Sequence, residues 1–298
     1  MDKTEVVQRM QEYIGEHIND EDFNLDGVYE AVGYSRRHGD RVFKELVGRT
    51  PQSYVKSICL TEGAGRLLET RNTVLDIALD SRFLSHEGFT RAFESRFQIS
   101  PAEYRKRPIA IPLFVPYPVS HYQALVKHME EEFMTNEIIM CTVTPVERPK
   151  RKLIFQRSRK AEEYFSYCQE MGCEWEGLLN SIPEKFDVAA LIELPKCLIK
   201  EGYSSVAAGV EVPLDYNARV PDGYEIAELE NCQMLYFQSE PYENAEDFCI
   251  AIESVYKAIE RYKPANYGYQ YNYDKAPSFN FGADAATGAK IAVPAVKI

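Results

Sequence analysis

Residues 73–106 read TVLDIALDSRFLSHEGFTRAFESRFQISPAEYRK, and residues 33–55 read GYSRRHGDRVFKELVGRTPQSYV. The two stretches belong to one repeated pattern, at an offset of 50 residues without a gap. The identical pairs are Leu25/Leu75, Asp26/Asp76, Ser35/Ser85, Arg41/Arg91, Phe43/Phe93, Pro51/Pro101, Tyr54/Tyr104 and Lys56/Lys106. A repeat at fixed spacing indicates that one supersecondary unit occurs twice.

Each copy contains a short apolar helix, a turn and a second helix that stops before Thr-Pro or Ser-Pro. Ser35 and Ser85 stand where a hydroxyl can cap the second helix, and Gly33 suits the left-handed end of the first. Thr73 and Asp76 have the spacing of a capping box. Two helices joined by a tight turn, found twice, predict two helix-turn-helix units in an all-α domain.

The second helix of each copy has a polar face that could reach base edges and phosphates in a major groove. An alternative is that these faces are simply solvated sides of a helical bundle. The residues predicted to contact DNA are Ser35, Arg36, Arg37, Asp40, Arg41, Lys44, Ser85, His86, Thr90 and Arg91.

The distribution of charge favours the DNA-binding interpretation. The whole chain carries a net charge of −12, which by itself argues against a nucleic-acid ligand. Residues 1–34 contain two basic and nine acidic residues, whereas residues 35–107 contain 14 basic and nine acidic residues, a net charge of +5. Basic charge is therefore concentrated on the repeated segment, where phosphate contacts need it.

These strings resemble the DNA-binding domain of the AraC/XylS family of bacterial transcription regulators, from about Val6 to Lys106. The resemblance implies two helix-turn-helix units joined by a helix over residues 51–70, each placing one recognition helix in the major groove. It also implies promoter DNA and RNA polymerase as partners. Departures from the family pattern, which we expect to loosen the fold or weaken DNA binding, are Gly39, Gly88, Cys59, Gly63, Gly65, Glu87 and Glu94.

A Pro-rich stretch follows, and residues 108–138 are predicted to be a linker between the domain at 1–107 and a second one at 139–298. Residues 153–156 read LIFQ and residues 235–238 read LYFQ, and each is followed by a helix-like run, at 161–182 and 245–262. Val210 and Ile291 belong to later strands that match at an offset of 81. The second domain is therefore predicted to be α+β, with two pseudo-symmetric strand-helix-strand-strand halves and a cleft for a small ligand.

The strings GYQYNYDKAPSFNF, LYFQSEPYE and IAVPAVKI in this domain resemble GyrI-like effector-binding domains, as found in Rob-type regulators. The resemblance implies an aromatic pocket with a buried Glu that binds apolar, often cationic molecules. Asn280 stands where the family has that Glu, so Glu240 is expected to replace it or the ligand to be neutral or polar. The candidate effector-binding residues are Phe155, Trp175, Phe237, Glu240, Glu253, Tyr269, Tyr271 and Asn280.

Alternatives stay open for these residues. Tyr267, Tyr269, Tyr271 and Tyr273 alternate, so on a strand they would share a face that either binds a cation or packs on a helix. Trp175 fits core packing, and Glu243 or a solvated face fits almost as well as Glu240 or Glu253.

All five histidines precede residue 129, so the second domain holds no Ser/Cys-His pair or His-bearing metal site. A one-component transcription regulator without catalytic residues, metal or cofactor is therefore expected. The alternatives are a GyrI-like hydrolase that uses Glu and Tyr, and a protein-binding module with a degenerate DNA domain. The sequence shows no secretory signal, membrane span or CxxC pair, and a bacterial cytoplasmic location is expected.

Overall fold

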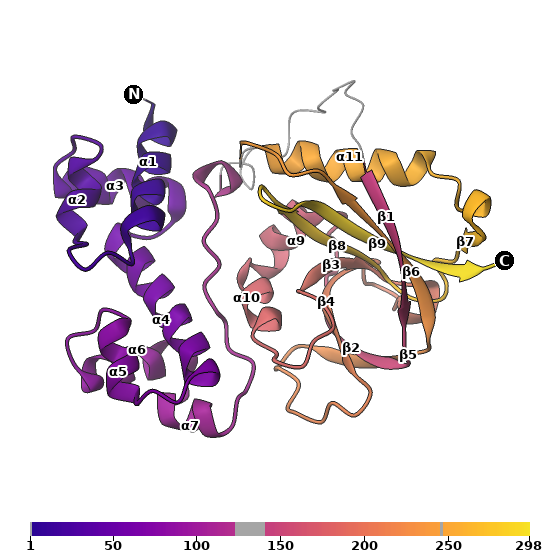
Figure 1. Ribbon diagram of the computed structural model, residues 1–298, viewed down its shortest axis with the longest axis horizontal. Coiled ribbons are helices and arrows are strands. Elements are labelled where there is room, and N and C mark those ends of the chain that lie inside the picture. The colour runs from indigo at the N-terminus through magenta and orange to yellow at the C-terminus, as the bar shows by residue number, and fades with distance from the viewer. Residues whose placement is uncertain (1, 123–140, 245–246) are drawn as a thin grey trace. The chain divides into compact units, whose positions relative to one another are not determined.

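A computed structural model describes residues 2–122, 141–244 and 247–298 (Figure 1). The chain divides into two compact units, Met1–Lys127 and His128–Ile298, so it is a multidomain chain with an α unit before an α+β unit. No helix within the described ranges is long and apolar enough to span a membrane. The two units are described separately below.

The first unit consists of helices, with no strand among its described residues. Their order along the chain is α1 (Lys3–His17), α2 (Leu25–Glu30), α3 (Arg36–Val47), α4 (Pro51–Glu69), α5 (Val74–Asp80), α6 (His86–Phe97) and α7 (Pro101–Lys106). The linking helix expected over 51–70 is α4, which begins at a proline after the capping residue Thr50.

Two hydrophobic cores lie along α4. In the first, Tyr54 and Cys59 pack with apolar residues of α1, α2 and α3. In the second, Leu60 and Leu67 pack with residues of α5, α6 and α7. Each helix pair thus buries its apolar face against its own part of one long helix, which holds both pairs in a single unit.

The repeat in the sequence is also a repeat in burial. Every residue from 36 to 56 has the same exposure, whether buried, half-buried or exposed, as the residue 50 positions later. The helix ends agree as well, because α3 and α6 both span 12 residues and both end at a residue with positive φ, Gly48 and Gln98.

The first part of the expected linker packs against the first unit. Ile111 and Phe114 are buried in the two cores. The backbone N–H of Phe114 donates to Thr61 Oγ1 at 2.8 Å, and Gln11 Nε2 donates to the carbonyl of Tyr117 at 2.8 Å. Residues 123–138 of that stretch lie outside the described residues.

The second unit is built on one antiparallel sheet. Its strands are β1 (Cys141–Arg148), β2 (Arg151–Arg157), β3 (Ala190–Glu193), β4 (Val206–Pro213), β5 (Glu225–Leu229), β6 (Cys232–Ser239), β7 (Tyr269–Tyr271), β8 (Ser278–Asp284) and β9 (Gly288–Lys297). Their order across the sheet is β1-β6-β9-β8-β3-β4-β2-β5, with β7 paired to β9.

This order forces the sheet to curve. β1 and β2 are joined by only two residues, Pro149 and Lys150, yet they lie near opposite ends of the strand order. A connection that short spans roughly 10 Å, so the two ends of the sheet must approach each other. Figure 1 shows the strands curling round in this way.

The strand registers repeat at an offset of 82. Leu153 pairs with Glu211 on β4, and Leu235 pairs with Val293 on β9. The offset of 81 expected for Val210 and Ile291 is therefore wrong by one residue.

The helices cover one surface of the curved sheet. α11 (Phe248–Arg261) packs on β6, β8 and β9, and α10 (Glu174–Asn180) packs on β4 (Figure 1). The helix expected at 161–182 is two helices, α9 (Tyr164–Met171) and α10, because Gly172 between them has φ +80°. The opposite, inner surface carries a core that includes Phe155, Ile192 and Phe279.

The four tyrosines expected on one strand do not share it. β7 holds only Tyr269 and Tyr271. Tyr267 ends a 3-10 helix, η3 (Pro264–Tyr267), which Gly268 terminates at φ +79°, and Tyr273 lies beyond the strand. That prediction is wrong, because alternation in sequence places side chains on one face only while the backbone stays extended.

Candidate functional site

The exposed surface of α3 is strongly basic. Arg36, Arg37, Arg41 and Lys44 are all exposed, and Ser35 precedes them at the N-cap position. The Ser35 side chain makes no capping hydrogen bond, contrary to expectation. The four cations are therefore concentrated on one short helix, where phosphate oxygens could approach them.

Asp40 lies beside these cations, and its carboxylate accepts a hydrogen bond from the neighbouring helix α2. The Tyr29 hydroxyl on α2 donates to Asp40 Oδ1 at 2.7 Å. Burial, followed by this contact with the Asp40 carboxylate, raises the pKa of Tyr29. One carboxylate oxygen of Asp40 is thereby occupied and its side chain is oriented.

Gly39 makes the Tyr29 contact possible. A Cβ at position 39 would lie 2.6 Å from Tyr29 Cδ1, so a larger residue would displace the tyrosine ring. The expectation that Gly39 loosens this helix pair is therefore incomplete, because the ring of Tyr29, only 3% exposed, fills the space.

The corresponding surface of α6 is nearly uncharged in total. His86 and Arg91 are exposed, but so are Glu87 and Glu94. The backbone at Glu87 and the Ser85 side chain lower the pKa of the Glu87 carboxyl, which keeps it ionised. Ser85 caps α6 as expected, accepting from the N–H of Gly88 at 3.1 Å. α6 therefore offers weaker attraction to phosphates than α3.

Thr90 stands at the position equivalent to Asp40, 50 residues later, but its side chain has a different environment. Its Oγ1 is buried and has no hydrogen-bond partner among the described residues. In this second copy Phe89 stands at the position equivalent to Gly39. Leu79, at the position equivalent to Tyr29, is 54% exposed.

The residues proposed from sequence for effector binding do not form one cluster. Phe237 and Glu253 line a groove of about 290 Å³ beside α11, where Glu253 pairs with Lys257 at 2.7 Å. Phe155 lies in the inner-surface core, and Trp175 is buried on α10.

The other candidates serve the structure around α11 or lie apart from it. Asn280 Nδ2 donates to the Tyr256 hydroxyl at 3.3 Å, and the Tyr271 hydroxyl donates to the carbonyl of Ile259 at 3.1 Å. Tyr269 packs against the core under α11, and Glu240 is exposed after β6. Structure therefore divides the set between both surfaces of the sheet.

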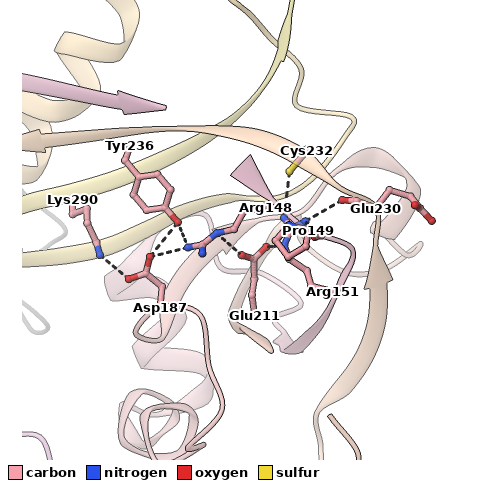
Figure 2. Close-up of polar contacts among 9 residues, drawn as sticks. All are labelled: Arg148, Pro149, Arg151, Asp187, Glu211, Glu230, Cys232, Tyr236 and Lys290. Carbon is pink, nitrogen blue, oxygen red and sulfur yellow. Dashed lines mark hydrogen bonds and ion pairs between the residues drawn. The ribbon is translucent and has the colours of Figure 1, made fainter. Parts of the chain in front are cut away.

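A buried network of charges lies where the two ends of the sheet meet (Figure 2). Arg151 Nε donates to Glu211 Oε1 at 2.5 Å, and Arg148 Nε lies 3.5 Å from Glu211 Oε2. Arg151 also donates to the carbonyls of Pro149 and Glu230 and to Cys232 Sγ. Its side chain has no exposed surface. Burial raises the pKa of the Glu211 carboxyl against the pull of Arg151 and Arg148.

The network continues toward solvent through Asp187. Arg148 Nη2 donates to Asp187 Oδ2 at 3.1 Å, and Tyr236 donates to the same oxygen at 3.1 Å. Lys290 Nζ donates to Asp187 Oδ1 at 2.7 Å and lies 4.4 Å from the centre of the Phe281 ring. Figure 2 shows the charged groups in a row from Lys290 to Arg151.

Comparisons with known proteins agree with the geometry of the first unit. A family model described as a helix-turn-helix domain matches residues 28–107. Regulatory protein SoxS of Salmonella typhimurium is 33% identical over 107 residues, which cover 36% of this chain and 99% of SoxS. The chain belongs to the AraC/XylS family of transcription regulators.

Longer relatives match over the same region. Right origin-binding protein of Escherichia coli K12 is 36% identical over 108 residues, 36% of this chain and 37% of that protein. The match thus spans about a third of the length of this relative.

Solved structures are similar at low scores. The C-terminal domain of AraT from Geobacillus stearothermophilus is 25% identical over 36% of this chain and 88% of that chain, with a TM-score of 0.33. The C-terminal domain of EcmrR is 10% identical over 54% of this chain and 100% of that chain, with a TM-score of 0.35.

Two features of this AraC-type chain were not found from its sequence. Tyr29 was not among the residues singled out from the sequence, although Gly39, at a position where the family usually has a large apolar residue, was a signal that another side chain fills the space. The network from Lys290 to Arg151 joins residues of five separate segments and left no signal in spacing.

Proposed function

We propose that this AraC-type regulator binds double-stranded DNA through α3 and α6, as two helix-turn-helix units in adjacent segments of the major groove. The observation that carries the proposal is the repeated exposure pattern of residues 36–56 and 86–106, with basic side chains on its outward face. Position by position, the ten residues predicted from sequence remain the proposed contacts. The regulator would act at promoters in the bacterial cytoplasm, with RNA polymerase as a further partner.

The test is DNA binding at several salt concentrations. Selection from a library of random duplexes should enrich one sequence, and affinity for it should fall steeply with salt because bound phosphates release counterions. Arg91→Ala should weaken binding, whereas Arg71→Ala, outside both helices, is the matched control. Binding that is absent, or independent of salt, would refute the proposal.

We further propose that the second unit, spanning 139–298, binds a small molecule and thereby changes how the first unit engages DNA. Support comes from the inner surface of the sheet, which faces away from α11 and carries aromatic rings beside a charge network. The registers that repeat at an offset of 82 support two related halves for this unit.

The connection at 108–138 is the proposed route of coupling. Its described part is attached to the first unit through Ile111, Phe114 and Tyr117, so a change at its far end can reach the helices through existing contacts. A ligand that shifts DNA affinity should lose that effect in Phe114→Ala while still binding. Unchanged coupling in a folded Phe114→Ala protein would exclude this route.

A further inference from the structure

The charge network of the second unit has more positive than negative groups. Its cations are Lys290, Arg148 and Arg151, and its carboxylates are those of Asp187 and Glu211. The groups therefore carry a formal net charge of +1, and protonation of Glu211 would only increase the excess. The two carboxylates therefore neutralise two of the three cations, and an added anion could pair with the third.

The excess lies at the exposed end of the row. Arg151 has four different partners and is fully buried, and Arg148 contacts Asp187, Glu211 and Tyr236. Lys290 contacts one carboxylate oxygen, although an ammonium group has three donors. Its side chain is 29% exposed, so an anion from solvent can reach it.

Aromatic rings adjoin this ammonium group. The rings of Tyr236 and Phe281 lie 5.9 Å apart at an interplanar angle of 13°, and those of Phe281 and Phe279 lie 5.8 Å apart at 10°. Tyr236 and Phe281 are only partly buried. The parts of these two rings that remain exposed would accept an apolar body next to the charge.

An organic cation fits this place less well. The ammonium of Lys290 already occupies the position that combines the Asp187 carboxylate with the faces of Phe281 and Tyr236. A cationic ligand would have to displace it or remain beside it in a cluster that is already positive.

We propose that Lys290, Tyr236 and Phe281 form a binding site for an amphipathic organic anion, whose carboxylate or similar group pairs with Lys290 and whose apolar body lies against the two rings. The proposal rests on the sensing role proposed above and specifies the class of effector. Asp187 and Arg148 act as positioning residues, because they fix the ammonium group and the Tyr236 hydroxyl without contacting the ligand.

The experiment compares three probes with the same ring system: naphthoate, neutral naphthamide and naphthylmethylammonium. Calorimetric titration of the full chain at neutral pH should show that naphthoate binds most tightly. Lys290→Met should weaken the binding of naphthoate roughly tenfold or more, as expected for loss of a hydrogen bond between charged groups. The same variant should leave the affinity for naphthamide unchanged. Lys290→Arg should retain most of the affinity. Lys297→Met, an exposed change on the same strand, is the control.

Three results would overturn the proposal. The first is tighter binding of the ammonium probe than of naphthoate, and the second is an unchanged naphthoate affinity in folded Lys290→Met. The third is the absence of binding of all three probes. If naphthoate binds as expected but leaves DNA affinity unchanged, the ligand class stands and the sensing role fails, so the two outcomes are distinguishable.

Discussion

The second helices of the two pairs in the first unit bury the same positions, but the pairs fill their cores differently. In the α2–α3 pair an aromatic ring comes from Tyr29 on the first helix and meets Gly39 on the second. In the α5–α6 pair the ring comes from Phe89 on the second helix, and Leu79 on the first is exposed. A core thus constrains the volume at a contact but not the helix that supplies it.

The exchange also changes the surface that we propose faces DNA. Because the ring in the first pair is a tyrosine, its hydroxyl orients Asp40 among four cations. The second pair has no such tether, and Glu87 and Glu94 offset its basic groups. We infer that α3 contributes more of the electrostatic attraction and α6 less.

The most disruptive test of this comparison is Gly39→Phe. The new ring would meet Tyr29, and overpacking of this kind costs about 1–3 kcal/mol. The double variant Gly39→Phe with Tyr29→Leu copies the other pair and should recover part of that loss. Urea unfolding followed by helical circular dichroism measures both.

Gly88→Ala is the control, since its Cβ would meet only Ser85 Oγ, at 3.3 Å. A Gly39→Phe protein as stable as wild type would show that Tyr29 can move at little cost. Equal losses in the single and double variants would show that the two positions are not coupled.

The difference in charge is tested by Arg41→Ala and Arg91→Ala, which occupy equivalent positions. Loss of an arginine contact costs about 1–3 kcal/mol of DNA-binding free energy. We expect the loss in Arg41→Ala to lie toward the upper end of this range and the loss in Arg91→Ala toward the lower end. Fluorescence anisotropy on a selected duplex at several salt concentrations measures each loss.

Glu94→Gln sharpens the same test, because removing a carboxylate from α6 should raise DNA affinity. Equal losses for the two arginine variants, or no gain in Glu94→Gln, would contradict the inference that α3 dominates.

Tyr29→Phe removes only the hydrogen bond from the Tyr29 hydroxyl to Asp40. It should destabilise the first unit by about 1 kcal/mol, the usual net value of one hydrogen bond. The matched change in the other pair is Thr90→Val. Because Thr90 Oγ1 is buried without a partner in the described structure, this variant should be neutral or stabilising. Thermal melts measure both, and a loss in Thr90→Val larger than that in Tyr29→Phe would contradict the assignment.

The smallest expected difference between the two pairs is in how the N-terminal caps of α2 and α5 respond to low pH. α5 is capped by Thr73 with Asp76, whose pKa is lowered by the Thr73 side chain and backbone N–H. α2 is capped by the amide of Asn24, which does not titrate. A lowered carboxyl pKa means that the stabilisation is present above the ordinary pKa of 3.8 and is lost as the pH falls through the lower, folded value.

Asp76→Asn should therefore remove part of the acid sensitivity of the first unit below about pH 4. Melts at a series of pH values check this, with Asp26→Asn at the equivalent position as control. Identical acid profiles for Asp76→Asn and wild type would exclude the cap as a source of that sensitivity.

Much of the first unit was predictable from sequence, because its contacts are local. The linking helix expected at 51–70 is Pro51–Glu69, and the buried faces follow from spacing along each helix. The helix interruption at Gly172 and the end of the 3-10 helix at Gly268 were missed, since a run of favourable residues does not reveal a backbone turn with positive φ.

The sequence alone determined the repeated helix pairs, their outward basic residues and the change to a strand-rich second unit, because each follows from periodicity within a few tens of residues. Only the tertiary structure decided that Tyr29 holds Asp40, and that Lys290, Asp187, Arg148, Glu211 and Arg151 meet in one row. Those contacts depend on which strands pair across a curved sheet and which helix fills a shared core. Both are set by the packing of the whole unit, which no local pattern records.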